Sequence, residues 1–292
     1  MAKRILLFVV TNIAIMVTLS IVMALLGIGG YIQPGGGLDY GALMVFCLFW
    51  GMGGAFISLL ISRMIAKMAM GVKLVDGSTG RAEADWLYRT VERLTKQAGL
   101  PMPEVGIYES PEVNAFATGP SRSRSLVAVS SGLLRSMRPE EIEGVLAHEV
   151  SHIKNGDMVT MTLIQGVVNA FVMFFARIIA NIVRQAVDER YSYILSFVVV
   201  IVMQIVLGFF GMMIVAWFSR AREFRADAGG AALAGRAAMI GALERLRTTH
   251  ELVDTSQPSL ATMKISDKKS WFALLSTHPP LEDRIRALQT AR

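Results

Sequence analysis

The sequence predicts an α-helical membrane protein that carries a mainly helical, α+β cytoplasmic domain with a small antiparallel sheet. The chain is 53% hydrophobic and only 18% charged, whereas soluble domains carry about 25% charged residues. Its charged residues gather in separate segments, and four long runs are almost free of charge. We therefore divide the chain into an N-terminal transmembrane hairpin, residues 1–70, a second hydrophobic hairpin, 158–219, and two parts of one cytoplasmic domain, 71–157 and 220–292.

The first hairpin is predicted from two uncharged runs and the charges beside them. Residues 5–26 are long enough to cross a bilayer at ~20 residues. The run is too long for a secretory signal and lacks a small-x-small cleavage site, so we interpret it as a retained anchor. The second run, residues 40–62, ends before Arg63. Positive charge outside both ends, and none between them, predicts that both ends face the cytoplasm.

The second hairpin leaves two interpretations open. Residues 158–176 and 191–219 are uncharged, and their length favours two spanning helices. Arg177 and Arg190 would then lie on the outer side, where cations are disfavoured. A hairpin that is buried in protein or only partly inserted is the alternative.

Charge and cysteine content exclude two classes of function. The net charge of +6 is explained by basic residues beside apolar runs, and no basic motif with interleaved aromatic residues predicts nucleic-acid binding. Cys47 is the single cysteine and lies in an apolar run, so the sequence predicts neither an internal disulfide nor thiol chemistry.

The cytoplasmic domain begins with alternating short elements. An amphipathic pattern predicts a helix over 81–98 that ends at Gly99. A second helix should begin at Pro139, pass through His152 and stop at Asn155–Gly156. Between the two helices, Pro and Gly separate three predicted strands, at 104–108, 114–118 and 126–130.

The predicted chemistry lies in residues 148–152. His148 and His152 stand four residues apart, so on a helix they lie one turn apart on the same face, where both imidazoles can hold one zinc ion. Glu149 is about 100° further round the helix, placed to reach a water molecule rather than the metal. Two ligands and a general base are the arrangement of zinc hydrolases. The sequence therefore predicts a zincin-like metalloprotease domain with one Zn²⁺ per chain.

A third ligand is expected, because catalytic zinc usually takes three protein ligands. His250 lies in a polar stretch that favours an exposed histidine. Glu223 and Asp227 are again four residues apart. We predict that Glu223 binds zinc and that Asp227 accepts a hydrogen bond from the free ring N–H of a zinc-bound histidine. The alternative is a solvated face on which both carboxylates pair with Arg222 and Arg225.

Several motifs stand in one order along the chain: His148-Glu149-x-x-His152, Glu223-x-x-x-Asp227 and Thr-His-Pro-Pro at 277–280, together with Asn-Ala-Phe-Ala-Thr-Gly at 114–119 and Asn-Gly-Asp at 155–157. In these motifs and in the placing of its four apolar runs, the chain resembles the HtpX family of bacterial membrane zinc proteases. That family is related to the CAAX prenyl proteases within the gluzincin group. The resemblance covers essentially the whole chain.

The resemblance implies further site residues and a setting. Asn114, Ala115, Phe116 and Ala117 would belong to an edge strand that binds extended substrate through backbone hydrogen bonds. His278 would stabilise the oxyanion, with Arg284 as a further candidate for that role. The family implies an inner-membrane endopeptidase with its active site and termini in the cytoplasm. Its substrates would be misfolded or damaged membrane proteins or other unfolded polypeptides.

Two other functions fit parts of the sequence. A metal-stabilised membrane scaffold or chaperone would bind unfolded segments without cutting them, but Glu149 argues against it, because a structural zinc site needs no base. A prenyl-protein protease fits the chemistry, but it predicts a larger membrane chamber than four apolar runs supply.

Overall fold

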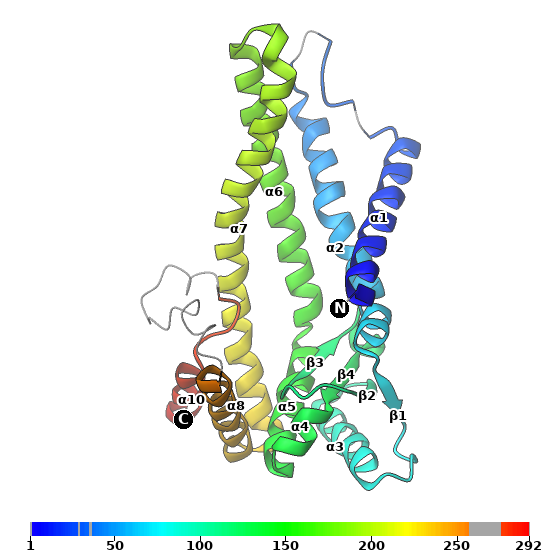
Figure 1. The fold of residues 1–292 in the computed structure, drawn as a ribbon, viewed down its shortest axis with the longest axis vertical. Coiled ribbons are helices and arrows are strands. Elements are labelled where there is room, and N and C mark those ends of the chain that lie inside the picture. The colour runs from blue at the N-terminus through cyan, green and yellow to red at the C-terminus, as the bar shows by residue number, and fades with distance from the viewer. Residues whose placement is uncertain (1, 29, 35–36, 257–275, 292) are drawn as a thin grey trace. The chain divides into compact units, whose positions relative to one another are not determined.

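The computed structural model describes residues 2–28, 30–34, 37–256 and 276–291 (Figure 1). The chain forms two compact units, each built from two separate stretches of sequence. The first, which we term the helical unit, contains Met1–Leu60 and Thr160–Val215, and the second, the α+β unit, contains Ile61–Val159 and Ala216–Arg292. The division into membrane hairpins and cytoplasmic parts at residues 70, 157 and 219 stays a prediction.

Four long helices account for the predicted apolar runs. They are α1 (Ala2–Leu25), α2 (Tyr40–Met70), α6 (Asp157–Ala186) and α7 (Glu189–Ala234). In the described part of the chain, α2, α6 and α7 are long and apolar enough to cross a membrane, and α1 contributes a shorter apolar stretch, Val9–Leu25. Helix α6 continues through Arg177, so that residue interrupts the hydropathy without ending the helix.

Small residues bring α2 and α6 together in the helical unit. A β-carbon at Gly51 would lie 2.6 Å from the backbone nitrogen of Ala170, so no larger residue fits there. Leu43, Cys47 and Ala170 form a buried cluster beside this contact. Close backbone approach at small residues is how helices gain packing energy in an apolar solvent.

The α+β unit contains a four-stranded sheet of order β1-β2-β4-β3. Its strands are β1 (Lys73–Val75), β2 (Glu104–Tyr108), β3 (Ala115–Thr118) and β4 (Leu126–Ser130). The β1–β2 and β3–β4 pairs are antiparallel, but β2 and β4 are parallel.

The sheet is therefore mixed, and the predicted purely antiparallel arrangement was wrong in this respect. Every residue of β4 is buried, whereas the residues of β3 are all half-buried. An apolar strand that is covered on both faces belongs inside a sheet. Accordingly β4 inserts between β2 and β3, and β3 remains at the edge.

Helices cover the sheet on both faces. On one face, α3 (Ala82–Ala98) and α5 (Pro139–Asn155) share a core with Val105, Val127 and Val129. On the other face, Ala66 and Met70 of α2 pack on Tyr108 and Ala128. Both predicted helices are confirmed, and each ends at a left-handed glycine, Gly99 (φ 68°) and Gly156 (φ 69°). Without a Cβ, glycine adopts this conformation readily.

The remaining elements complete the α+β unit. A 3-10 turn, η1 (Arg122–Arg124), precedes β4, and the short helix α4 (Ser131–Ser136) follows that strand. Two C-terminal helices, α8 (Arg236–Ser256) and α10 (Leu281–Thr290), pack together through Met239, Leu243, Ile285 and Leu288. Helix α8 also packs along α5 through Ala242. The histidine-bearing helix α5 is thus enclosed by the sheet, α3 and α8.

Candidate metal centre

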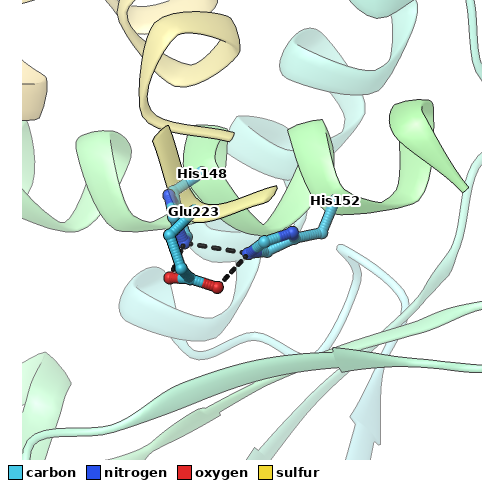
Figure 2. A group of neighbouring side chains, drawn as sticks. All are labelled: His148, His152 and Glu223. Atoms are coloured by element: carbon cyan, nitrogen blue, oxygen red, sulfur yellow. Dashed lines mark hydrogen bonds and ion pairs between the residues drawn. The ribbon is translucent and has the colours of Figure 1, made fainter. Parts of the chain in front are cut away.

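The predicted ligands converge on one point. His148 and His152 project from one face of α5, and their Nε2 atoms lie 3.0 Å apart. Glu223 comes from the C-terminal part of α7, and its carboxylate faces both rings (Figure 2). Its two oxygens lie 3.5 Å from Nε2 of His148 and 3.5 Å from Nε2 of His152. One donor atom from each residue lies within 4.8 Å of the others, so the three could hold a metal ion.

Each histidine is oriented by a carboxylate behind it. Nδ1 of His148 lies 2.9 Å from Oδ1 of Asp227, and Nδ1 of His152 lies 2.7 Å from Oδ2 of Asp157. A carboxylate at Nδ1 favours the tautomer that carries its proton there, which leaves the lone pair of Nε2 free for a metal. In its neutral form, each ring held in this way presents an electron pair toward Glu223.

The donor set fits a metal ion. Oε1 of Glu223 is buried, and no hydrogen bond reaches it from the described residues. Nε of Arg222 is 3.6 Å away, beyond hydrogen-bond distance. An unsatisfied buried acceptor costs about 1–3 kcal/mol, and a cation would remove that cost. Two imidazole nitrogens and one carboxylate suit zinc.

Electrostatics also favours positive charge at this position. Burial lowers the pKa of His148, but the hydrogen bonds to Asp227 and Glu223 and the charge of Glu149 outweigh burial and raise the pKa to about 9. Without a metal, His148 thus holds a proton among three carboxylates. A divalent cation would replace that proton, since metal ligation requires the neutral imidazole.

Arg284 contacts Asp227 and also lines the cavity beside the ligands. It lies in the first turn of α10 and is buried, and its Nε and Nη2 donate to the two carboxylate oxygens of Asp227 at 2.7 and 2.6 Å. Nη1 of Arg284 is 3.5 Å from Glu223. This bidentate contact fixes the carboxylate that orients His148. The role of Arg284 as an oxyanion donor stays a prediction.

A cavity of about 140 Å³ opens beside the ligands. Glu149 and His278 line it, together with Asn114 and Ala115 at the start of β3. Nδ1 of His278 is 3.1 Å from Oε2 of Glu223, and the His278 side chain is 62% exposed. The structure therefore brings Glu149, His278 and the strand together. Phe116 and Ala117 follow on β3, where Phe116 packs against Tyr108 and Ala117 packs against the core beneath α5.

Glycines allow α7 to approach α5 closely. A β-carbon at Gly230 would lie 3.1 Å from the backbone nitrogen of His148, and one at Gly229 would lie 2.7 Å from Oγ of Ser151. On α5, a β-carbon at Gly144 would lie 2.5 Å from the carbonyl oxygen of Ala238. Gly229 and Gly230 thus allow α7 to approach α5, the two helices that carry the candidate ligands, and Gly144 allows α8 to approach α5.

Sequence reasoning missed the contact of Asp157. The Asn-Gly-Asp motif at 155–157 assigns no role to this residue, because the direction of its side chain depends on the turn at Gly156. The available signal in the sequence was an acidic residue, Asp157, that stands five positions after His152 and directly before an apolar run. The His250 side chain, the alternative third ligand, lies outside the described residues.

Comparisons with known proteins identify the family of the chain. Residues 81–292 match the model of peptidase family M48. The chain is 52% identical to a protease HtpX homolog of Bacillus licheniformis over 99% of both chains. It is also 52% identical to protease HtpX of Shewanella loihica, over 98% of this chain and 99% of the relative.

The fold has a counterpart among solved structures. The crystal structure of S. mikatae Ste24p superposes with a TM-score of 0.64 at 17% identity, over 99% of this chain and 67% of that one. Hydrophobic helices and these relatives together define the chain as a membrane metalloprotease. It belongs to peptidase family M48 and, within that family, to the HtpX proteases.

Proposed function

We propose that this membrane metalloprotease is a zinc-dependent endopeptidase whose metal is held by His148, His152 and Glu223. The convergence of their donor atoms within 4.8 Å carries the proposal. The carboxylates behind the two histidines support it, because they leave both Nε2 atoms available. Zinc bound here would lower the pKa of a water molecule and polarise the scissile carbonyl.

The residues around the cavity have separate roles in this proposal. Glu149 accepts a proton from the attacking water and later delivers it to the leaving amine. His278 donates a hydrogen bond to the developing oxyanion. Both side chains line the cavity that His148 and Glu223 also line. Asp227, held by Arg284, and Asp157 keep the two imidazoles in position.

The substrate would bind beside β3. This strand is an edge of the sheet, and it is paired on one side with β4. Asn114 and Ala115 line the cavity where the strand begins. An extended peptide that pairs with the open edge, from Ala115 to Ala117, gains affinity from backbone hydrogen bonds. Such binding demands little of the substrate's sequence, which suits unfolded polypeptides.

We further propose an inner-membrane location with the termini and the metal centre in the cytoplasm. The ligand-bearing segments border the hydrophobic runs, because α6 begins at Asp157 and the apolar part of α7 ends four residues before Glu223. A protease of this design would act on cytoplasmic parts of misfolded or damaged membrane proteins.

Glu149→Gln tests the function. We expect it to retain one zinc per chain and to lower cleavage of an unfolded membrane-protein substrate by about 10²–10⁴-fold, the usual contribution of a general base. Metal analysis and gel-based cleavage, both on detergent-purified protein, measure the two effects. Undiminished cleavage would remove Glu149 from the mechanism. A wild-type protein that binds the substrate without cutting it would favour the scaffold function instead.

Cysteine labelling tests the orientation. Cys47 is replaced first, and single cysteines are then placed at Gly37 and Ala82. An impermeant maleimide added to intact cells should label position 37 and spare position 82. Labelling of position 82 from outside would reverse the proposed topology.

A further inference from the structure

A second polar feature lies in the helical unit, and no residue of the candidate metal centre lines it. A cavity of about 490 Å³ is lined by α1, α2 and α6. Its walls are mainly apolar and include Met23, Phe46 and Met173. Arg177, Trp50 and Ser20 also line it, and they are its only polar side chains among the described residues. The polar groups are thus one cation, one indole N–H and one hydroxyl, with no carboxylate.

Arg177 brings a charge with little compensation. Its Nη1 donates to the carbonyl oxygen of Met173 at 3.2 Å, and its guanidinium lies 5.2 Å from the ring centre of Phe46. A guanidinium has five N–H donors, so most of them remain available. No carboxylate of the described residues lies within ion-pair distance of Arg177. An unpaired cation in an apolar helix is costly, and residues of this kind usually have a partner.

Trp50 provides a second available donor at the same cavity. Its Nε1 is buried, and no hydrogen-bond acceptor in the described part of the chain reaches it. Buried polar groups are normally hydrogen-bonded. Arg177 and Trp50 thus offer donors that lack sufficient acceptors, and the walls around them are apolar. Such a cavity is complementary to an anion that carries a hydrocarbon chain.

The place of the cavity in the helical unit suggests which anion this is. The lining residue Ile28 lies just beyond Leu25, where α1 ends, and Phe46 lies within two turns of Tyr40, where α2 begins. The cavity therefore sits beside the connection of the first hairpin. At such a helix end the lipid head groups begin, and long cationic side chains reach toward them.

We propose that this cavity binds an anionic phospholipid, with the phosphate on Arg177 and one acyl chain along the apolar walls. The guanidinium matches phosphate geometry through paired N–H donors. Trp50 also lines the cavity, and its Nε1 is a second donor without an acceptor among the described residues. The proposal is independent of the protease mechanism, because none of its residues belongs to the metal centre.

Fluorescence of Trp50 can report the lipid directly. Replacing Trp86, Trp217 and Trp271 by Phe leaves Trp50 as the single tryptophan, and this parent is purified in a non-ionic detergent. Phosphatidylglycerol with brominated acyl chains is the probe, because bromine quenches a neighbouring indole on contact. We expect saturable quenching of the parent, and half-saturation at a higher lipid fraction with brominated phosphatidylcholine, whose head group carries no net charge.

Variants then separate charge recognition from hydrocarbon binding. Arg177→Gln should raise the half-saturating fraction of phosphatidylglycerol at least tenfold. Arg177→Lys should give a half-saturating fraction between those of the parent and Arg177→Gln. Arg184→Gln is the matched control, because Arg184 is two turns further along α6, contacts Asn181 and does not line the cavity. It should bind as the parent does. Size-exclusion profiles confirm that each variant is folded.

Three results would overturn the proposal. Absence of saturable quenching in the parent would mean that no acyl chain occupies the cavity. Equal half-saturation for the parent and Arg177→Gln would mean that the cavity takes hydrocarbon without recognising charge. Displacement of the lipid by millimolar inorganic phosphate would show an anion site that does not depend on the acyl chain.

Discussion

Nδ1 of His152 lies 2.7 Å from Oδ2 of Asp157, across the left-handed turn at Gly156 that ends α5. Asp157 is 2% exposed and is the first residue of α6. The same carboxylate therefore orients a proposed metal ligand and lies at the positive end of a helix. The turn at Gly156 thus joins α5, which carries the two histidines, to α6, where the second hydrophobic hairpin begins.

Asp157→Ala should weaken metal binding without abolishing it. The expected loss is about 10–100-fold in zinc affinity, the usual effect of removing a group that orients a ligand. Chelator competition followed by metal analysis measures it. Asp157→Asn is the matched control, because its carbonyl oxygen can still accept from Nδ1, and it should lose less. An unchanged affinity in Asp157→Ala would show that packing alone orients His152.

Glu223→Ala should yield largely zinc-free protein. The change removes a ligand atom and leaves two histidines, too few for a stable catalytic zinc site. Asp227→Ala is the comparison variant and should retain zinc at an affinity about 10–100-fold lower. Full zinc occupancy in purified Glu223→Ala would move the third ligand elsewhere, and the same analysis of His250→Ala and His278→Ala would identify it.

Glu141→Gln should lower the melting temperature of the α+β unit in a pH-dependent way. The backbone N–H of Arg138 donates to Glu141 at 2.8 Å, and the guanidinium of Arg138 donates to the same carboxylate. Burial raises the pKa of Glu141, but these hydrogen bonds outweigh it and lower the pKa below its ordinary value. A lowered folded-state pKa gives stability that is present above the unfolded pKa of about 4.3 and is lost as pH falls through the folded value.

The expected cost of Glu141→Gln at pH 7 is about 1 kcal/mol, typical of one hydrogen-bonded helix cap. The difference from wild type should begin to shrink as pH falls below the unfolded pKa of about 4.3, and it should vanish once the pH is below the lowered pKa of the folded carboxyl group. Glu140→Gln is the control, since Glu140 is exposed in the same helical turn. Thermal scans in detergent across pH 3–8 compare the three proteins. A cost that does not change with pH would exclude the charge as its source.

Local patterns predicted most of the elements that position the site. The boundaries of β2 and β4 and the ends of α3 and α5 follow from alternation and from Gly99 and Gly156. The helical spacing of His148 and His152 and of Glu223 and Asp227 requires only neighbours along one helix. Such information is contained in a few consecutive residues, and it could therefore be predicted.

Non-local features could not be predicted in the same way. The parallel pairing of β2 with β4 depends on which strand is covered on both faces, and this in turn depends on helices elsewhere in the chain. The strand β1 is only three residues long and carries no alternation that identifies it. Arg284 reaches Asp227 across 57 residues of sequence, so its partner became evident only from the folded chain.

The geometry of the proposed metal centre depends on the distance between α5 and α7, which the glycines at their crossing keep short. A methyl group at Gly230 would press on the backbone of His148 itself, and one at Gly229 would press on Ser151, one residue before His152. Either would push apart the two helices that supply the proposed nitrogen and oxygen ligands. Affinity for the ion could thus be lost through added volume alone, with every ligand intact. A mutational survey confined to acids, bases and histidines would therefore overlook Gly229 and Gly230, which set the distance between the two helices.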